Sequence, residues 1–244
     1  MKIPGKLLPV FLSIILFSCD KDDDPTGPTP VPSFAQDRLV IEAGETITFT
    51  NTSTDAATYL WNFGDGGTST AENPNYTYAA TGTYDIVLTA TGSGGISQTA
   101  TASVVVGQRY AVAIGIVSIN FENANSEPWD DDSGPDVLFG FAKVTDTSIS
   151  LFDLGEDYVA EDFPVGGELE PDSQTLLTNE DWSFIFIDND EPMDELNLEN
   201  QDAVMFYTEL NPTTIASEKD YETGEGYFTV NEFGFEFTIG FQVR

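Results

Sequence analysis

The 244-residue chain carries 42 acidic and 8 basic residues, a formal net charge of −34, and no histidine. A nucleic-acid binder, or a protein held on anionic lipid by a basic patch, needs clustered Lys and Arg, so both classes are excluded. The missing imidazole excludes a histidine base, and the single cysteine excludes an internal disulfide and a cysteine zinc site.

The chain begins with a stretch typical of an exported protein. Lys2 and Lys6 precede an apolar run from Leu7 to Phe17, which is too short to span a bilayer comfortably and indicates a secretory signal. The letters LFSCD, which begin with the last two residues of this run, resemble a bacterial lipobox, whose cysteine is diacylated and becomes the mature N-terminus. The resemblance implies a signal peptide over residues 1–18 and a lipid anchor on Cys19. The alternative is that Cys19 is a buried free thiol.

Residues 19–32 are acidic and then proline-rich, which predicts an extended, solvated tether. The acidic tract directly after the cysteine resembles the surface-export signal of Bacteroidota-type lipoproteins. This resemblance implies an outer-membrane lipoprotein that faces outward from the cell. An acidic tether on a periplasmic lipoprotein is the alternative.

Residues 33–107 alternate strand and turn signals. The stretch ETITFT places Ile47 and Phe49 on one face, and TYDIVLTA does the same with Tyr84, Ile86 and Leu88. Alternation with a period of two is typical of half-buried antiparallel strands. The pattern therefore predicts a first all-β domain.

The stretch YLWNFGDGG within this segment, followed by Pro74, Tyr76 and Tyr78, resembles the polycystic kidney disease (PKD) domain, a small immunoglobulin-like sandwich. The resemblance covers residues 33–107. It implies an extracellular spacer or a weak protein- or carbohydrate-contact module, not an enzyme.

The residues of this signature have architectural roles. We expect Trp61 to fill the core between the sheets. Gly64 to Gly67 should form a turn in which the Asp65 side chain accepts hydrogen bonds from backbone amides and glycines adopt positive φ. Asp65 is accordingly predicted to be structural and not catalytic.

Residues 108–244 hold 31 acidic and 4 basic residues and still contain apolar strands. The stretches AVAIGIVSINF, VLFGFAKV and WSFIFID have strand length, and FGFEFTIGFQV alternates from Phe233 to Val243. No convincing amphipathic helix occurs. We therefore predict an all-β protein with two antiparallel β-sandwich domains in tandem behind a lipidated tether.

Two acidic loops are predicted at strand ends of the second domain. WDDDSGPD supplies Asp130 and Asp136 before the strand that starts at Val137, and FIDNDEPMDEL supplies Asp188 and Asp190 after another strand. Calcium takes about six to eight oxygen ligands and favours several carboxylates on rigid supports. Two loops at one end of a sandwich could supply them.

The spacing of these aspartates resembles the calcium-binding end of the lipid-binding sandwich domains of protein kinase C and synaptotagmin. The resemblance implies calcium held by five side chains: Asp130, Asp136, Asp188, Asp190 and Asp194. Asp194 comes about two residues earlier than in that family, and Asp131 and Asp132 are predicted to be solvated neighbours. Docking on phospholipid requires basic or apolar loop tips and is not carried over, because the domain has only Lys143 and Lys219 besides Arg109 and Arg244. The alternative is that the aspartates form a solvated acidic surface.

Trp129, beside the first loop, could stack on a sugar ring or pack beneath its own loop. Paired carboxylates could also serve a glycoside hydrolase, but no pair here has an apolar setting that would raise one pKa. No nucleophile elbow occurs either. The sequence thus predicts a non-catalytic, calcium-stabilised binding or scaffold lipoprotein for extracellular glycan or protein ligands. A secreted carbohydrate-active enzyme or accessory subunit is the alternative.

Overall fold

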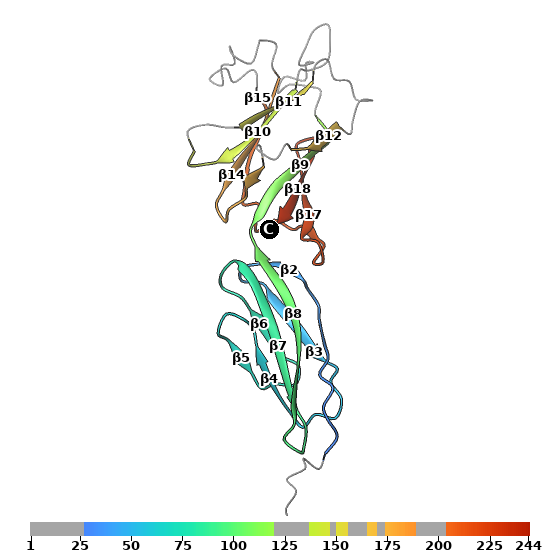
Figure 1. Ribbon diagram of the computed structural model, residues 1–244. Coiled ribbons are helices and arrows are strands. Elements are labelled where there is room, and N and C mark those ends of the chain that lie inside the picture. Colours follow the sequence, from blue (N-terminus) through green and yellow to red (C-terminus); the bar gives the residue numbers. More distant parts are fainter. Residues whose placement is uncertain (1–26, 120–136, 147–149, 156–164, 170–173, 189–203) are drawn as a thin grey trace, which may run out of the picture.

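The computed structural model describes residues 27–119, 137–146, 150–155, 165–169, 174–188 and 204–244 (Figure 1). Every regular element in this part of the chain is a strand, so the predicted all-β fold is confirmed. Within the same residues, no helix has the length and apolar character that crossing a membrane requires.

The first domain consists of two sheets. One has the order β1-β3-β6, with strands Phe34–Gln36, Thr46–Asn51 and Asn75–Thr77. The other has the order β2-β8-β7-β4-β5, with strands Val40–Glu42, Ser97–Gly107, Gly82–Thr91, Thr58–Asn62 and Thr68–Ser69. The pair β2–β8 is parallel, and the remaining pairs are antiparallel.

Trp61 lies at the centre of the first core. Its ring is fully buried against Phe34, Phe49 and Phe63, with ring centroids 5.1 to 6.5 Å apart. Its indole N–H donates to the carbonyl of Ala71 at 2.9 Å, so no buried donor is left unpaired there. The predicted role of Trp61 and the predicted inward alternation of the strands are confirmed.

The turn from Gly64 to Gly67 has the expected geometry. Gly64 and Gly66 adopt φ of 87° and 98°. An Asp65 carboxylate oxygen accepts from the Gly67 amide at 2.9 Å and from the Tyr76 hydroxyl at 2.8 Å. Asp65 therefore fixes a turn, as predicted.

Backbone hydrogen bonds already hold the chain against this domain at Val31, before the predicted domain start at residue 33. Val31 forms a bridge with Thr54, with both amide-to-carbonyl distances at 3.0 Å, and Pro30 is buried. The last residues of the expected tether thus lie against the domain.

The second domain also pairs two sheets. One has the order β11-β10-β14-β15, with strands Ser150–Gly155, Val137–Lys143, Trp182–Asp188 and Val204–Leu210. The other has the order β12-β9-β18-β17-β16, with strands Val165–Glu168, Arg109–Ser118, Phe235–Val243, Glu225–Glu232 and Glu218–Lys219; β13 (Thr175–Leu176) also pairs with β9. All pairs are antiparallel.

Aromatic rings fill the second core. Phe237 of β18 is fully buried and lies 5.4 to 5.7 Å, centroid to centroid, from Phe139, Phe184 and Phe186 of the facing sheet. The inward alternation predicted for the last strand holds from Phe235 to Val243.

Phe233 departs from that alternation. Its side chain is 85% exposed and its φ is 52°, followed by Gly234 at 87°. Glu232 pairs with Phe235, so residues 233 and 234 form a two-residue hairpin turn that requires positive φ at both positions. The prediction that Phe233 belongs to the core-facing row was wrong because the strand begins two residues later.

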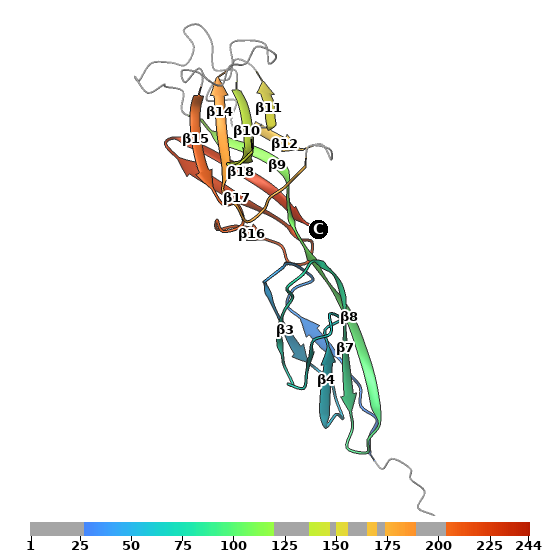
Figure 2. The same cartoon turned by 90° about the vertical axis from the view of Figure 1, so that its left-hand side faces the viewer.

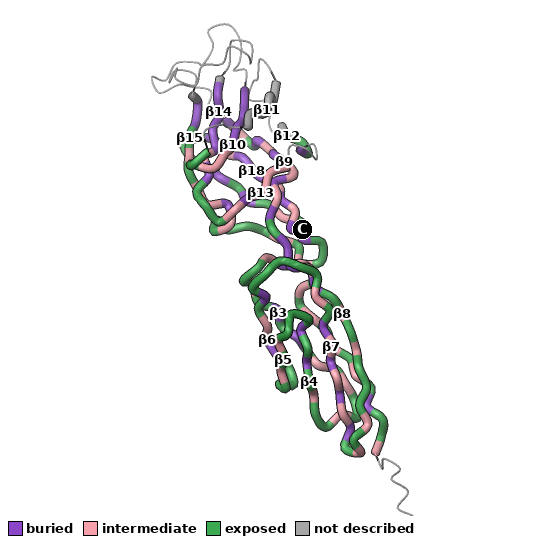
Figure 3. Tube along the Cα trace, turned by 60° about the vertical axis from the view of Figure 1, so that its left-hand side comes forward, coloured by how far each residue is buried: buried purple, intermediate pink, exposed green. Residues whose placement is uncertain are grey.

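The two domains lie end to end (Figures 1 and 2). β8 of the first domain continues into β9 of the second with only Gln108 between them. Buried residues occur on several strands in each domain, and some of them lie next to the junction (Figure 3). The fold therefore has three regions of functional interest: the junction, the second sandwich, and the end of that sandwich away from the first domain.

Candidate functional site

The predicted calcium site lies mostly outside the described residues. Asp130, Asp136, Asp190, Asp194 and Trp129 all fall there. Asp188 is the last residue of β14, and its backbone pairs with Val137, the first residue of β10. The strand that follows the first acidic stretch and the strand that precedes the second are thus neighbours.

This pairing places both strand ends at the end of the sandwich away from the first domain (Figure 2). In the part of the chain that the structure describes, no three acidic or cysteine side chains form a group that could hold a metal ion. Calcium binding, and lipidation of Cys19, which is also outside the described residues, stay predictions.

The junction between the domains is fixed by backbone hydrogen bonds. Gln108 and Arg244 exchange amide-to-carbonyl bonds of 3.0 Å in both directions. The amides of Leu39 and Val40 donate to the carbonyl of Tyr221 at 2.8 Å. Gly107 permits this approach, because a Cβ there would lie 2.7 Å from the Arg244 amide nitrogen.

Charged side chains from both domains meet at the same place. Glu42 of the first domain accepts from Arg109 at 2.9 Å and from Lys219 at 3.0 Å, both in the second domain. Lys219 also donates to Glu45 at 2.6 Å. We call these four residues the junction ion cluster. The side chains of Arg109 and Lys219 are only 5% exposed, so water screens these pairs weakly.

The cluster shifts the ionisation of Glu42. Burial alone raises the pKa of this carboxyl, but its hydrogen bonds to Arg109 and Lys219 and their positive charges outweigh burial, and the pKa is lowered. Glu42 is therefore a carboxylate at neutral pH, as the pairing requires.

Each domain also packs a side chain against the core of the other. Tyr221 of the second domain lies against the first core, and Val40 of the first domain lies against the second core. The Tyr221 ring is contacted by two cations, with the Arg38 guanidinium carbon 4.1 Å and the Lys219 nitrogen 4.8 Å from its centroid. Apolar, cation–π and ionic contacts thus coincide at the junction.

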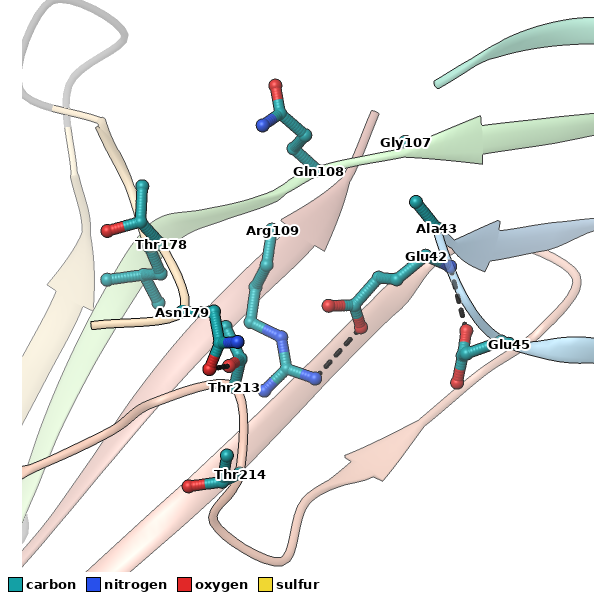
Figure 4. Close-up of a pocket in the computed structure, with 11 residues that line it drawn as sticks. Glu42, Ala43, Glu45, Gly107, Gln108, Arg109, Thr178, Asn179, Thr213 and Thr214 are labelled. Carbon is teal, nitrogen blue, oxygen red and sulfur yellow. Dashed lines mark hydrogen bonds and ion pairs between the residues drawn. The ribbon is translucent and has the colours of Figure 1, made fainter. Parts of the chain in front are cut away.

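A pocket of about 480 Å³ opens beside the junction ion cluster (Figure 4). Both domains contribute to it. Its lining residues are Glu42, Ala43, Glu45, Gly107, Gln108, Arg109, Leu177, Thr178, Asn179, Thr213 and Thr214. We refer to it as the junction pocket.

Hydrogen bonds hold the polar wall of the junction pocket. Asn179 Oδ1 accepts from Asn211 Nδ2 at 2.9 Å and from the Thr213 hydroxyl at 3.1 Å. Next to this wall, Arg109 donates to the Pro212 carbonyl at 2.7 Å and to Glu42. The Arg109 Nε is buried and has no acceptor among the described residues.

The sequence did not single out the junction. It indicated only that bases are rare, and four of the five beyond residue 26 lie there: Arg38, Arg109, Lys219 and Arg244. In so acidic a chain, the rarity of bases is a signal that each has a partner. Which acids those partners are depends on how the two domains meet.

Comparison with known proteins bears on the first domain. The family model described as "PKD domain" matches residues 27–106. A microbial collagenase of Vibrio alginolyticus is 43% identical over 70 residues, which are 27% of this chain and 9% of that protein. The pre-pro-metalloprotease PrtV of Vibrio cholerae is 31% identical over 105 residues, 38% of this chain and 11% of that protein.

One solved structure to which the chain is similar is a crystal structure of a single domain. The PKD1 domain of Vibrio cholerae PrtV is 34% identical and covers 32% of this chain and 98% of its own, with a TM-score of 0.29. The chain spans about a tenth or less of the length of the curated relatives it matches, so the similarity concerns one domain. Residues 27–106 form a PKD domain.

Proposed function

We propose that this protein is a non-catalytic surface lipoprotein whose PKD domain is a stiff spacer and whose second sandwich presents a binding surface away from the membrane. The lipid anchor on Cys19, the outward-facing location and calcium binding by the acidic loops are parts of this proposal. The matched relatives are a collagenase and a metalloprotease, which supports an extracellular setting for the PKD domain.

The fixed junction is the observation that carries the proposal. A spacer transmits position only if its joints do not bend, and linked domains move relative to one another unless their interface is substantial. Here the direct passage of β8 into β9 through Gln108, the hydrogen bonds of the Leu39 and Val40 amides to Tyr221 and the junction ion cluster oppose bending together. The two domains should therefore move as one body.

Spin labels can test the stiffness. In the full chain with Cys19→Ser, labels at Thr99→Cys and Asn231→Cys lie on exposed positions of the first and second domain. We expect one narrow interspin distance distribution. Gly107→Ala, whose Cβ would collide with the Arg244 backbone, should broaden it. A broad distribution in the parent chain would show that the domains are jointed and overturn the spacer.

The calcium proposal rests on the neighbouring ends of β10 and β14 and on the aspartates that adjoin them in sequence. Titration calorimetry of the full chain with calcium should give saturable heat, and calcium should raise the melting temperature relative to chelator. Asp188→Ala with Asp190→Ala should abolish both effects.

A matched control removes the same charge elsewhere. Asp146 and Asp181 are exposed and lie beyond the opposite ends of β10 and β14, so replacing both by Ala should leave the calcium heat unchanged. Equal loss in both double variants would reduce the effect to general charge screening. If calorimetry of the parent chain shows no heat of calcium binding, the calcium part of the proposal is rejected.

A further inference from the structure

We propose that the junction pocket binds a neutral, hydroxylated ligand of the size of a sugar residue. The proposal goes beyond the spacer function and uses only one part of it, the fixed position of the two domains. A volume of about 480 Å³ is in the range of small-molecule sites in proteins. The pocket exists only where the domains meet, so its shape depends on both.

Charge selects against ionic ligands. The two carboxylates that line the pocket, Glu42 and Glu45, are already neutralised by Arg109 and Lys219. A divalent cation would have to displace those bases, and the rest of the highly acidic chain repels an anion. A ligand without net charge meets neither obstacle.

The hydrogen-bonding groups suit hydroxyls. The Thr213 hydroxyl donates its one hydrogen to the Asn211 or Asn179 oxygen, so its own oxygen is left as an acceptor. The Asn179 oxygen is occupied by Asn211 and Thr213, so its NH₂ group is left as a donor. A sugar hydroxyl both donates and accepts, and it can bond to such a pair at once.

The wall is also ordered before any ligand arrives. Asn179 and Thr213 lie beside the Arg109 guanidinium, with Glu42 on its other side (Figure 4). Thr213 is held further by its amide, which donates to Asn211 Oδ1 at 3.0 Å. Groups that are already fixed lose little conformational entropy on binding, which favours even a small ligand.

The test uses the full chain and named sugars. Saturation-transfer NMR and calorimetry are run with glucose, galactose, mannose and N-acetylglucosamine, and with glucuronate as the charged counterpart. We expect saturable binding of at least one neutral sugar, with glucuronate about tenfold weaker or absent.

Two variants test whether the sugar binds in the junction pocket. Ala43→Trp should fill the pocket without removing a side-chain hydrogen bond, and Asn179→Ala removes the free NH₂ group; each should weaken binding by about tenfold or more. The control is Thr229→Val with Thr238→Val, which removes a hydroxyl pair bonded at 3.0 Å on β17 and β18 outside the pocket. Binding by that control should equal that of the parent chain.

Three results would overturn the proposal: no neutral sugar bound, glucuronate bound as tightly as the neutral sugars, or binding unchanged by both pocket variants. The interspin distances separate this failure from failure of the spacer. A narrow distribution without sugar binding rejects the pocket and keeps the spacer, whereas a broad distribution rejects the spacer itself.

Discussion

The two ends of the second sandwich differ in charge. Three of the domain's four bases, Arg109, Lys219 and Arg244, lie at the junction end. The fourth, Lys143, is the last residue of β10, and the far end of the sandwich is where β10 begins. At the far end, the strands lead in sequence to the stretches 120–136, 156–164 and 189–203, which contain 16 of the domain's 31 acidic residues. Three of the four bases of this domain thus lie where it attaches to the first domain, whereas 16 of its 31 acids belong to stretches that adjoin the far strand ends in sequence.

This difference shows two uses of charge in one domain. At the junction, opposite charges are paired, nearly buried and geometrically fixed, so they specify orientation. The acidic stretches 120–136, 156–164 and 189–203 contain no base in their sequence, so their like charges need cations from solution to relieve the repulsion. The two ends should therefore respond differently to mutation, pH and salt.

The largest loss of folding stability is expected from a mutation in the core of the second sandwich, which involves neither end. Phe237→Ala removes a fully buried ring that contacts rings from β10 and β14. We expect it to lower the free energy of unfolding by about 3 to 5 kcal/mol. Urea unfolding followed by tryptophan fluorescence and circular dichroism measures this loss. A loss under about 1 kcal/mol would mean that the sandwich core is not continuous.

The second-largest loss of stability is expected when the junction ion cluster is broken. Glu42→Gln leaves Arg109 and Lys219 nearly buried with less compensating charge. We expect it to lower the free energy of unfolding by about 2 to 3 kcal/mol. This loss is smaller than for a fully buried pair because the Glu42 side chain is 18% exposed. The matched control Glu72→Gln removes one exposed acid of the same domain and should cost under about 0.5 kcal/mol. Equal effects would reduce the cluster to a surface contact.

The pH dependence of folding stability tests whether the contribution of Glu42 is ionic. The folded-state pKa of Glu42 lies below the usual 4.5, so its ionised form stabilises the fold fully above that value. This stability is lost as pH falls through the lowered pKa. The difference in unfolding free energy between the parent chain and Glu42→Gln should thus be constant near neutral pH and shrink below about pH 4. A difference independent of pH would contradict the ionic origin.

The smallest effect on stability is expected at the tip of the β17–β18 hairpin. Phe233 adopts a positive φ that suits Asn or Gly better than an aromatic residue. Phe233→Asn should stabilise the protein by about 0.5 to 1 kcal/mol. A loss of stability would mean that the exposed ring has a partner that stabilises the fold. Differential scanning calorimetry at matched pH resolves the sign.

Sequence was sufficient where local patterns decide the structure. The signature around Trp61 and Asp65 determines a turn and a core position within a few residues. Alternation or an apolar run identified six strands: β3, β7, β9, β10, β14 and β18. It failed at Phe233, because alternation continues through a tight turn and only the pairing of Glu232 with Phe235 locates the strand end.

The junction could not be predicted for a different reason. Glu42 and Lys219 are 177 positions apart in sequence and belong to different domains, so no local pattern relates them. The predicted calcium ligands are intermediate: the strands on either side of them were identified correctly and are neighbours, but Asp130, Asp136, Asp190 and Asp194 themselves fall outside the described residues.

The position of β18 has a consequence for folding. It is the last strand of the second sandwich in sequence, yet it lies between β9, the first strand, and β17. The sheet is therefore incomplete until residues from both ends of the domain have met, and contacts this distant in sequence form slowly. Until then the phenylalanines of β18 and the facing sheet remain uncovered. A chain that is synthesised from its N-terminus therefore needs protection from aggregation until β18 is available to pair.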